Sequence, residues 1–144
     1  MGGQDRSIDN IDAQLLTILQ ENARVSQADM ARAVGLAPSA VLERLRKLES
    51  RGIVTGFAAL LSPRAVDLAQ LAFVAVRVSG TGEQEEQAGA RLAAVPEVLE
   101  VHHVAGEDCY LLKVRTRDAQ HLGTLLRQRL GRIPGVVSTR TTVV

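Results

Sequence analysis

The fold is decided by residues 26–51, which read SQADMARAVGLAPSAVLERLRKLESR. Ser26 followed three residues later by Asp29 is a helix-start signal, because such side chains bond the free backbone N–H groups of a first turn. Gly35 is a typical helix stop, and Pro38 suits the first position of a following helix. The stretch therefore predicts two helices joined by a tight turn, which is the helix-turn-helix motif.

The segments on either side extend this motif into a winged helix-turn-helix domain. Upstream, Ile11 and Leu15 begin a pattern of apolar residues at helical spacing, and Asp9 is placed to cap that helix. Downstream, residues 53–61 read IVTGFAALL and predict two short strands joined by a turn at the glycine. Three helices followed by a small hairpin form a winged helix-turn-helix.

The second half of the chain predicts a different architecture. Strand patterns cover residues 71–78, 98–104, 110–115 and 136–144, and helical patterns cover residues 83–95 and 118–133. The order βαββαβ is typical of a ferredoxin-like fold, a four-stranded antiparallel sheet with two helices on one face. We therefore expect an α+β protein with a winged helix-turn-helix domain at 1–61, a linker at 62–70 and a ferredoxin-like domain at 71–144.

Composition excludes several classes of protein. The 144 residues are 46% hydrophobic, which is typical of a globular chain, and no apolar run approaches the roughly 20 residues that span a bilayer. The polar start of the chain lacks the apolar core of a secretory signal, and the single cysteine, Cys109, cannot form an internal disulfide. We expect a cytoplasmic protein with no membrane segment. Only 2% of residues are aromatic, too few for the stacking surfaces that bind single-stranded nucleic acid.

The third predicted helix carries a local basic surface. Residues 39–51 contain four basic and two acidic residues, whereas residues 1–63 contain seven of each. The apolar residues Val41, Leu45 and Leu48 share one face, so the charged residues lie on the other. Such a helix suits a DNA major groove about 12 Å wide, with small side chains near the bases and long cations at the phosphates. The predicted DNA-binding residues are Ser26, Gln27, Ser39, Ala40, Glu43, Arg44, Arg46, Lys47 and Arg51.

Several longer motifs resemble the Lrp/AsnC regulators, also called feast/famine regulatory proteins. In the first half these are Ile8-Asp9-x-x-Asp12-x-x-Leu15-Leu16, Val34-Gly35-Leu36 and Arg44-Leu45-x-x-Leu48-Glu49-x-x-Gly52-Ile53-Val54. In the second half they are residues 104–114, VAGEDCYLLKV, and residues 134–144, PGVVSTRTTVV. The resemblance covers nearly the whole chain. It implies a transcription factor whose partners are double-stranded DNA, a small effector such as an amino acid, and further copies of the chain, paired as homodimers that assemble into tetramers or octamers.

The resemblance also implies where the effector binds. In the family this site lies between dimers, near the glycine-containing turn after the second sheet strand. Turn N–H groups and threonine hydroxyls can donate to a carboxylate, and acidic side chains can accept from an ammonium group. Cys109 stands where many family members have an Asp, and Ala37 stands where a capping Ser is common, at a cost of about 1 kcal/mol. The residues implied for the effector site are Ala105, Gly106, Glu107, Asp108, Cys109, Thr139 and Thr141.

Other signals predict neither a metal site nor a cofactor. His102 and His103 are adjacent on a predicted strand, so they face opposite sides and cannot chelate one metal in the usual way. The pair Gly80-x-Gly82 lacks the third glycine of a dinucleotide-binding loop. Two alternatives to a DNA-binding regulator stay open. One is an enzyme resembling the sirohaem decarboxylases, for which His102 or His103 would serve a tetrapyrrole pocket. The other is an effector-binding oligomer without DNA binding.

Overall fold

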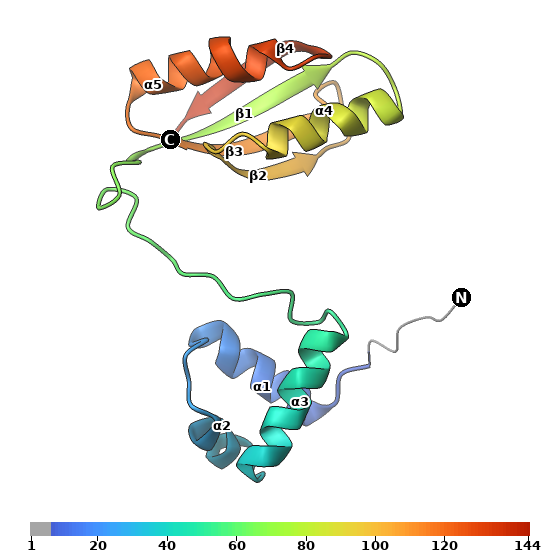
Figure 1. Cartoon of the computed structure of the whole chain (residues 1–144), viewed down its shortest axis with the longest axis vertical. Coiled ribbons are helices and arrows are strands. Elements are labelled where there is room, and N and C mark those ends of the chain that lie inside the picture. Colours follow the sequence, from blue (N-terminus) through green and yellow to red (C-terminus); the bar gives the residue numbers. More distant parts are fainter. Residues whose placement is uncertain (1–6) are drawn as a thin grey trace. The chain divides into compact units, whose positions relative to one another are not determined.

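The computed structural model describes residues 7–144, and the chain divides after Ala59 into two compact units (Figure 1). Residues 1–6, with which the predicted first domain begins, lie outside the described residues.

The N-terminal unit contains the three predicted helices, α1 (Asn10–Glu21), α2 (Gln27–Val34) and α3 (Pro38–Ser50). Asp9 caps α1 and Ser26 caps α2, as predicted, each accepting a bond from a backbone N–H of the first turn. Gly35 ends α2 with φ 72°, a left-handed conformation that costs glycine little. Ala37 precedes α3 without a side-chain cap, so Pro38 at the helix start is what favours its first turn.

The core of the N-terminal unit is small. Its fully buried cluster consists of Leu15, Met30, Ala31 and Val41, one or two residues from each helix. Seven half-buried apolar residues surround the cluster, among them Leu45 on α3. Because Val41 and Leu48 turn toward this core, the opposite face of α3 is exposed.

The predicted hairpin at residues 53–61 is wrong, because no strand forms anywhere between residues 51 and 69. The N–H groups of Ile53 and Val54 both bond to the carbonyl of Leu48 at the end of α3, at 2.9 and 3.1 Å, so they continue the helix end. Beyond them, Leu60 is 98% exposed and Phe57 is 57% exposed. An isolated two-stranded hairpin is marginally stable in water unless its apolar face packs on a core. The exposed side chains of Phe57 and Leu60 show that this segment has no such packing.

The C-terminal unit has the predicted βαββαβ order. Its strands are β1 (Gln70–Val78), β2 (Val98–His103), β3 (Tyr110–Thr116) and β4 (Val136–Val143). They form one antiparallel sheet in the order β2-β3-β1-β4. Helix α4 (Glu83–Ala93) follows β1, and α5 (Ala119–Thr124) follows β3. Both helices cover the same face of the sheet and leave the other face open (Figure 1).

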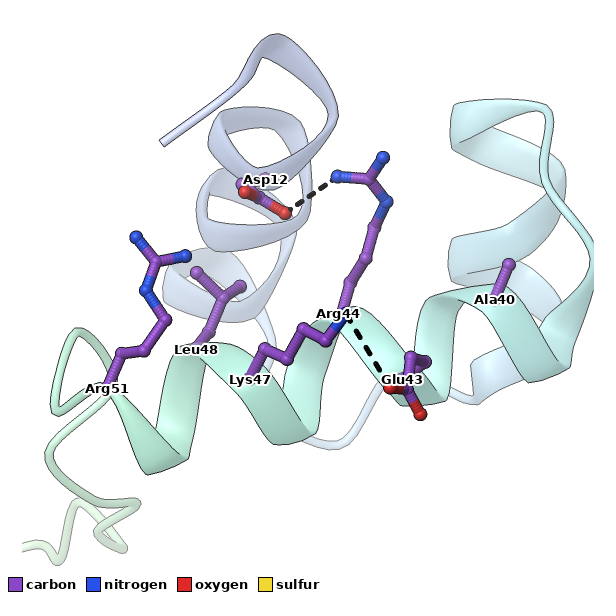
Figure 2. A pocket seen from close by; sticks show the side chains of 7 residues that line it. All are labelled: Asp12, Ala40, Glu43, Arg44, Lys47, Leu48 and Arg51. Carbon is purple, nitrogen blue, oxygen red and sulfur yellow. Dashed lines mark hydrogen bonds and ion pairs between the residues drawn. The ribbon is translucent and has the colours of Figure 1, made fainter. Parts of the chain in front are cut away.

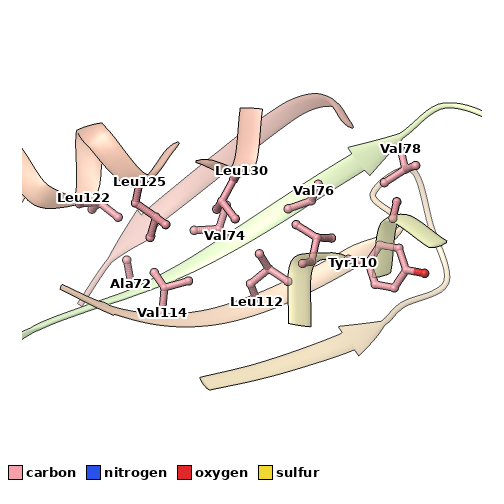
Figure 3. Close-up of a cluster of buried hydrophobic side chains, with 12 residues drawn as sticks. Ala72, Val74, Val76, Val78, Tyr110, Leu112, Val114, Leu122, Leu125 and Leu130 are labelled. Carbon is pink, nitrogen blue, oxygen red and sulfur yellow. The ribbon is translucent and has the colours of Figure 1, made fainter. Parts of the chain in front are cut away.

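The core of this unit is the space between the sheet and its helices (Figure 3). Twelve buried residues form it: Ala72, Val74, Val76, Val78, Ala88, Leu92, Tyr110, Leu112, Val114, Leu122, Leu125 and Leu130. Alternate residues of β1 and β3 point into the core, as strand geometry requires. The predicted helix over residues 118–133 is interrupted after α5 by a π-helical turn, η1 (Leu125–Arg129), and a short 3-10 turn, η2 (Leu130–Arg132).

Candidate DNA interface and effector site

The exposed face of α3 contains most of the residues predicted to bind DNA. Ser39, Glu43, Arg46 and Lys47 are exposed, and Ala40 is half-buried. Arg46 makes no ion pair with any residue that the structure describes, so its guanidinium is available to a ligand. The Lys47 ammonium lies 3.6 Å from the Glu43 carboxylate one turn away, in an exposed pair that contributes little stability.

Arg44 differs from the other cations of α3. Its guanidinium donates to the carboxylates of Asp9 and Asp12 at 2.6 and 3.0 Å, which ties α3 to the start of α1. Figure 2 shows the bond to Asp12. The hydrogen bond from Arg44 is the largest cause that holds the pKa of Asp9 below its usual range, and the backbone N–H of Asp12 adds to it. The bonds to Asp9 and Asp12 raise the pKa of Arg44 in turn. Arg44 therefore holds two helices together.

A hollow of about 330 Å³ lies beside this contact, between α3 and the start of α1. Its walls include the cations Arg44, Lys47 and Arg51 at positions i, i+3 and i+7 of one face (Figure 2). The guanidinium of Arg51 donates to the carbonyl of Ser7. The acidic groups in the walls are Asp12, already bonded to Arg44, and Glu43. The hollow therefore brings three cations and two carboxylates together beside the exposed face of α3.

Of the two predicted DNA-binding residues at the start of α2, Ser26 has its side chain hydrogen-bonded within residues 7–144 and Gln27 does not. The Ser26 hydroxyl accepts a bond from the Asp29 N–H at 3.0 Å and donates to the Asp29 carboxylate at 2.7 Å. The oxygen of this hydroxyl therefore caps the helix, and its hydrogen is engaged by the Asp29 carboxylate. Gln27, the first residue of α2, is exposed, and its side chain makes no hydrogen bond to the part of the chain that the structure describes.

The predicted effector turn connects β2 and β3. The N–H of Val104 bonds to the carbonyl of Cys109 at 2.9 Å, and the N–H of Cys109 bonds to the carbonyl of Val76 at 3.0 Å. These bonds close the turn and fix it to the end of β1. Gly106 has φ 139°, which favours glycine, and Ala105 and Glu107 are exposed. The Cys109 thiol is half-buried and lies 3.6 Å from the carbonyl of Val78, so it points toward the core.

Arg140, which the sequence did not single out, bonds to this turn. Its guanidinium donates to the Asp108 carboxylate at 2.6 Å, while the Arg140 side chain stays 78% exposed. Thr139 and Thr141 pair with the buried Val76 and Val74, so they lie on the helix-covered face of the sheet. Arg140 lies between them and faces the open side. Residues 138–142 are all polar, so no alternation along β4 marks Arg140, and its partner Asp108 lies 32 positions away.

The two adjacent histidines point to opposite faces of the sheet, as predicted. His102 bonds to Glu100 at 3.0 Å, and His103 bonds to Glu85 of α4 at 2.8 Å. No group of three or more metal-ligating side chains occurs among residues 7–144. Within the same residues, no helix has the length and hydropathy of a membrane span.

Family models match both halves of the chain. Residues 8–49 match the AsnC-type helix-turn-helix domain, and residues 71–144 match the Lrp/AsnC ligand binding domain. The chain is 39% identical to the leucine-responsive regulatory protein of Haemophilus influenzae over 142 residues, which cover 98% of this chain and 86% of that protein. It is also 39% identical to the leucine-responsive regulatory protein of Escherichia coli K12, over 96% of this chain and 85% of that protein.

Solved structures show the same architecture. A transcriptional regulator from Neisseria meningitidis in complex with L-methionine superimposes with a TM-score of 0.88 at 34% identity, covering 96% of this chain and 90% of the other. A feast or famine regulatory protein from Mycobacterium tuberculosis, also in complex with L-methionine, superimposes with a TM-score of 0.89 at 38% identity. That match covers 96% of this chain and 92% of the other.

Proposed function

Because the chain belongs to the Lrp/AsnC family of DNA-binding transcriptional regulators, we propose which of its residues contact DNA and effector. The DNA contact is assigned to the exposed face of α3, where Ser39 and Ala40 approach base edges in the major groove. The observation that carries this assignment is the free guanidinium of Arg46 beside Lys47 on that face. Ser26, Gln27 and Glu43 border the same contact.

The cations of α3 have separate tasks in this proposal. Arg46 and Lys47 bind phosphates or a guanine edge, and Arg51 binds a phosphate at the hollow beside α1. Arg44 is a positioning residue, since its guanidinium is engaged by Asp9 and Asp12. The Lys47 ammonium must leave its ion pair with Glu43 to bind DNA. Breaking this pair costs little free energy, because both side chains are exposed.

The DNA contact is tested by measuring affinity for promoter fragments at increasing salt. Replacing Arg46 by Gln should lower the slope of log affinity against log salt by about 0.9, the value for one lost phosphate contact. Arg91→Gln is the matched control, because Arg91 is exposed on α4 and has no acidic partner among the described residues. If the affinity of the unsubstituted protein for DNA did not change with salt, the proposal would be contradicted.

The effector that we propose is an amino acid bound at the turn of residues 105–109. A free amino acid carries an ammonium and a carboxylate, and the Asp108–Arg140 pair presents one partner for each. Both relatives solved with L-methionine share this fold over 96% of the chain. Cys109 cannot replace the Asp of other family members as an acceptor, because its thiol points inward. Thr139 and Thr141 would reach a ligand only from the helix-covered face.

A thermal-shift screen against the twenty amino acids tests the effector site. A ligand that binds only the folded protein raises the melting temperature by mass action, by an amount that grows with its concentration. Arg140→Gln should abolish the shift by the best ligand, and Thr142→Ser, a change on the same face of β4, should preserve it. A best ligand that stabilises the Arg140→Gln variant equally would contradict the assignment.

The assembly that we propose is a homodimer that pairs further into a tetramer or octamer in the cytoplasm. Support comes from the open face of the sheet, where Phe73 and Leu111 are partly exposed and no helix covers them. A Phe73→Glu variant should have a lower mass by sedimentation, with Val137→Glu as the control. The relatives reported above are named as regulators, so we propose no catalytic role.

A further inference from the structure

Charge is strongly segregated within the C-terminal unit. Residues 83–108 carry seven acidic residues and one basic residue, whereas residues 109–144 carry seven basic residues and one acidic residue. The N-terminal part of the chain shows no such imbalance, because residues 1–63 carry seven of each. The most basic continuous segment of the protein therefore lies outside the helix-turn-helix.

Ion pairs within the unit neutralise part of this segment. Lys113 pairs with Glu100 at 2.9 Å, Arg129 with Glu97 at 3.4 Å, and Arg140 with Asp108. Arg115 points its guanidinium at the carbonyls of Leu68 and Ala69. Three exposed arginines of residues 109–144 have no acidic partner in the part of the chain that the structure describes. They follow one another along the helical segment between β3 and β4, and we call them together the C-terminal arginine surface: Arg117 before α5, Arg127 in η1 and Arg132 at the end of η2.

Arg127 lies in the π-helical turn η1, on the side away from the core. Leu122 and Leu125 are buried, and residue 127 is about 200° from residue 125 around a helix of 3.6 residues per turn, so it is exposed. The wider turn of η1 brings Leu130 rather than residue 129 onto the core face, so Arg129 is exposed as well. Such turns occur frequently at functional sites. Gly123 allows the Arg127 guanidinium to lie along the helix, since a Cβ at residue 123 would come within 3.1 Å of it.

We propose that the C-terminal arginine surface is a second contact with the DNA backbone, independent of base sequence. The inference rests on the proposed function of α3 in DNA binding and adds a surface to it. Arginine is suited to this task, because its planar guanidinium bonds phosphate oxygens in pairs. The helix-turn-helix of the same chain already holds the duplex, so the second contact forms at a high effective concentration.

The two units are connected by residues 60–69, which form neither helix nor strand. Part of this connection is a turn, in which the N–H of Leu68 bonds to the carbonyl of Pro63 at 2.8 Å. The other candidate for this surface is the acidic start of α4 in a second copy of the chain, with Glu83 and Glu86 exposed. We favour DNA, because the family binds this polyanion and the N-terminal unit supplies no net positive charge for it.

The test compares the full-length protein with the triple variant Arg117→Gln, Arg127→Gln, Arg132→Gln on one promoter fragment between 50 and 200 mM salt. Each lost phosphate contact lowers the slope of log affinity against log salt by about 0.9. Three lost contacts shrink the change in affinity over this range by roughly 40-fold. The matched control is Arg91→Gln, and the mass of each variant is measured by light scattering.

The outcomes separate the alternatives. A lower slope at unchanged mass, for specific and random fragments alike, supports the second DNA contact. An unchanged slope overturns it, and so does a weaker affinity that accompanies a smaller assembly, which would assign the surface to a contact between copies. If the unsubstituted protein fails to bind DNA at all, the proposed role of α3 fails first, and that result is distinguishable from an effect confined to the triple variant.

Discussion

The N-terminal and C-terminal units hold their helices in place by different means. The N-terminal cluster has four fully buried residues, and α3 is tied to α1 through the Arg44 guanidinium as well as through apolar contacts. The C-terminal cluster has twelve, and its helices pack on a continuous sheet. A small core leaves the orientation of α3 dependent on single contacts. The larger core of the C-terminal unit holds its helices through many more apolar contacts.

The largest effect is expected from removing apolar volume from the small core. Leu15 is completely buried in α1, and its replacement by Ala should lower the free energy of unfolding of the N-terminal unit by about 2–5 kcal/mol. DNA binding should be lost, while stabilisation of the C-terminal unit by an amino acid should persist. Calorimetry and a gel-shift assay measure both, with the exposed Val137→Ala as control. If both units lost equal stability, Leu15 would not act on the N-terminal unit alone, and the two units would not be held independently.

The next effect concerns the ion pairs of Arg44. An Arg44→Gln variant should unfold at a lower urea concentration, because the Asp12 carboxylate, in a residue only 8% exposed, is left without its cation. The salt slope of DNA affinity should stay unchanged, since this guanidinium does not contact phosphate in our assignment. Adding Asp12→Asn should restore part of the stability. A slope lower by about 0.9 would instead place Arg44 on the DNA.

A comparable test in the large core uses a glycine. A Cβ at Gly89 of α4 would come within 2.5–2.9 Å of the Tyr110 ring and hydroxyl. Gly89→Ala should therefore cost about 1–3 kcal/mol and displace the Tyr110 hydroxyl from the carbonyl of Glu85, to which it donates at 2.9 Å. Gly56→Ala is the control, because nothing lies within 4 Å of that position. Equal melting temperatures for the two variants would show that Tyr110 moves aside at no cost.

The smallest effect is a pH dependence of the N-terminal unit. The hydrogen bond from Arg44 lowers the pKa of Asp9 below the ordinary value of 3.8, so the folded state favours the charged carboxylate. This contribution is complete above the ordinary value and is lost as the pH falls through the lowered pKa. Urea unfolding monitored between pH 6 and 2.5 should show the loss, and Asp9→Asn should reduce it. An Asp9→Asn variant with the same acid dependence would assign that dependence to other groups.

Much of the fold could be predicted because its signals are local. Asp9, Ser26 and Asp118 cap the helices that they precede, and each does so through a backbone N–H three residues away. The strands were predictable from the alternation of residues, and the order βαββαβ was predicted from them. The hairpin at residues 53–61 failed because a strand also needs a partner, and residue type alone cannot supply one.

The sites were predictable to a smaller extent. The helix that carries the basic face was identified from its apolar spacing, but the engagement of Arg44 depends on Asp9, 35 positions away. The bond from Arg140 to Asp108 joins residues 32 positions apart across the sheet. Neither contact has a signal in the neighbouring sequence.

The amino-acid sequence by itself determined the order of helices and strands, their caps, and the resemblance that identified the family. These features depend on residues within a few positions of one another, where backbone geometry fixes the spacing. Only the tertiary structure decided which cations are free for a ligand and which hold helices together. That decision depends on carboxylates brought near by folding, and a charge is engaged or free according to its neighbours in space.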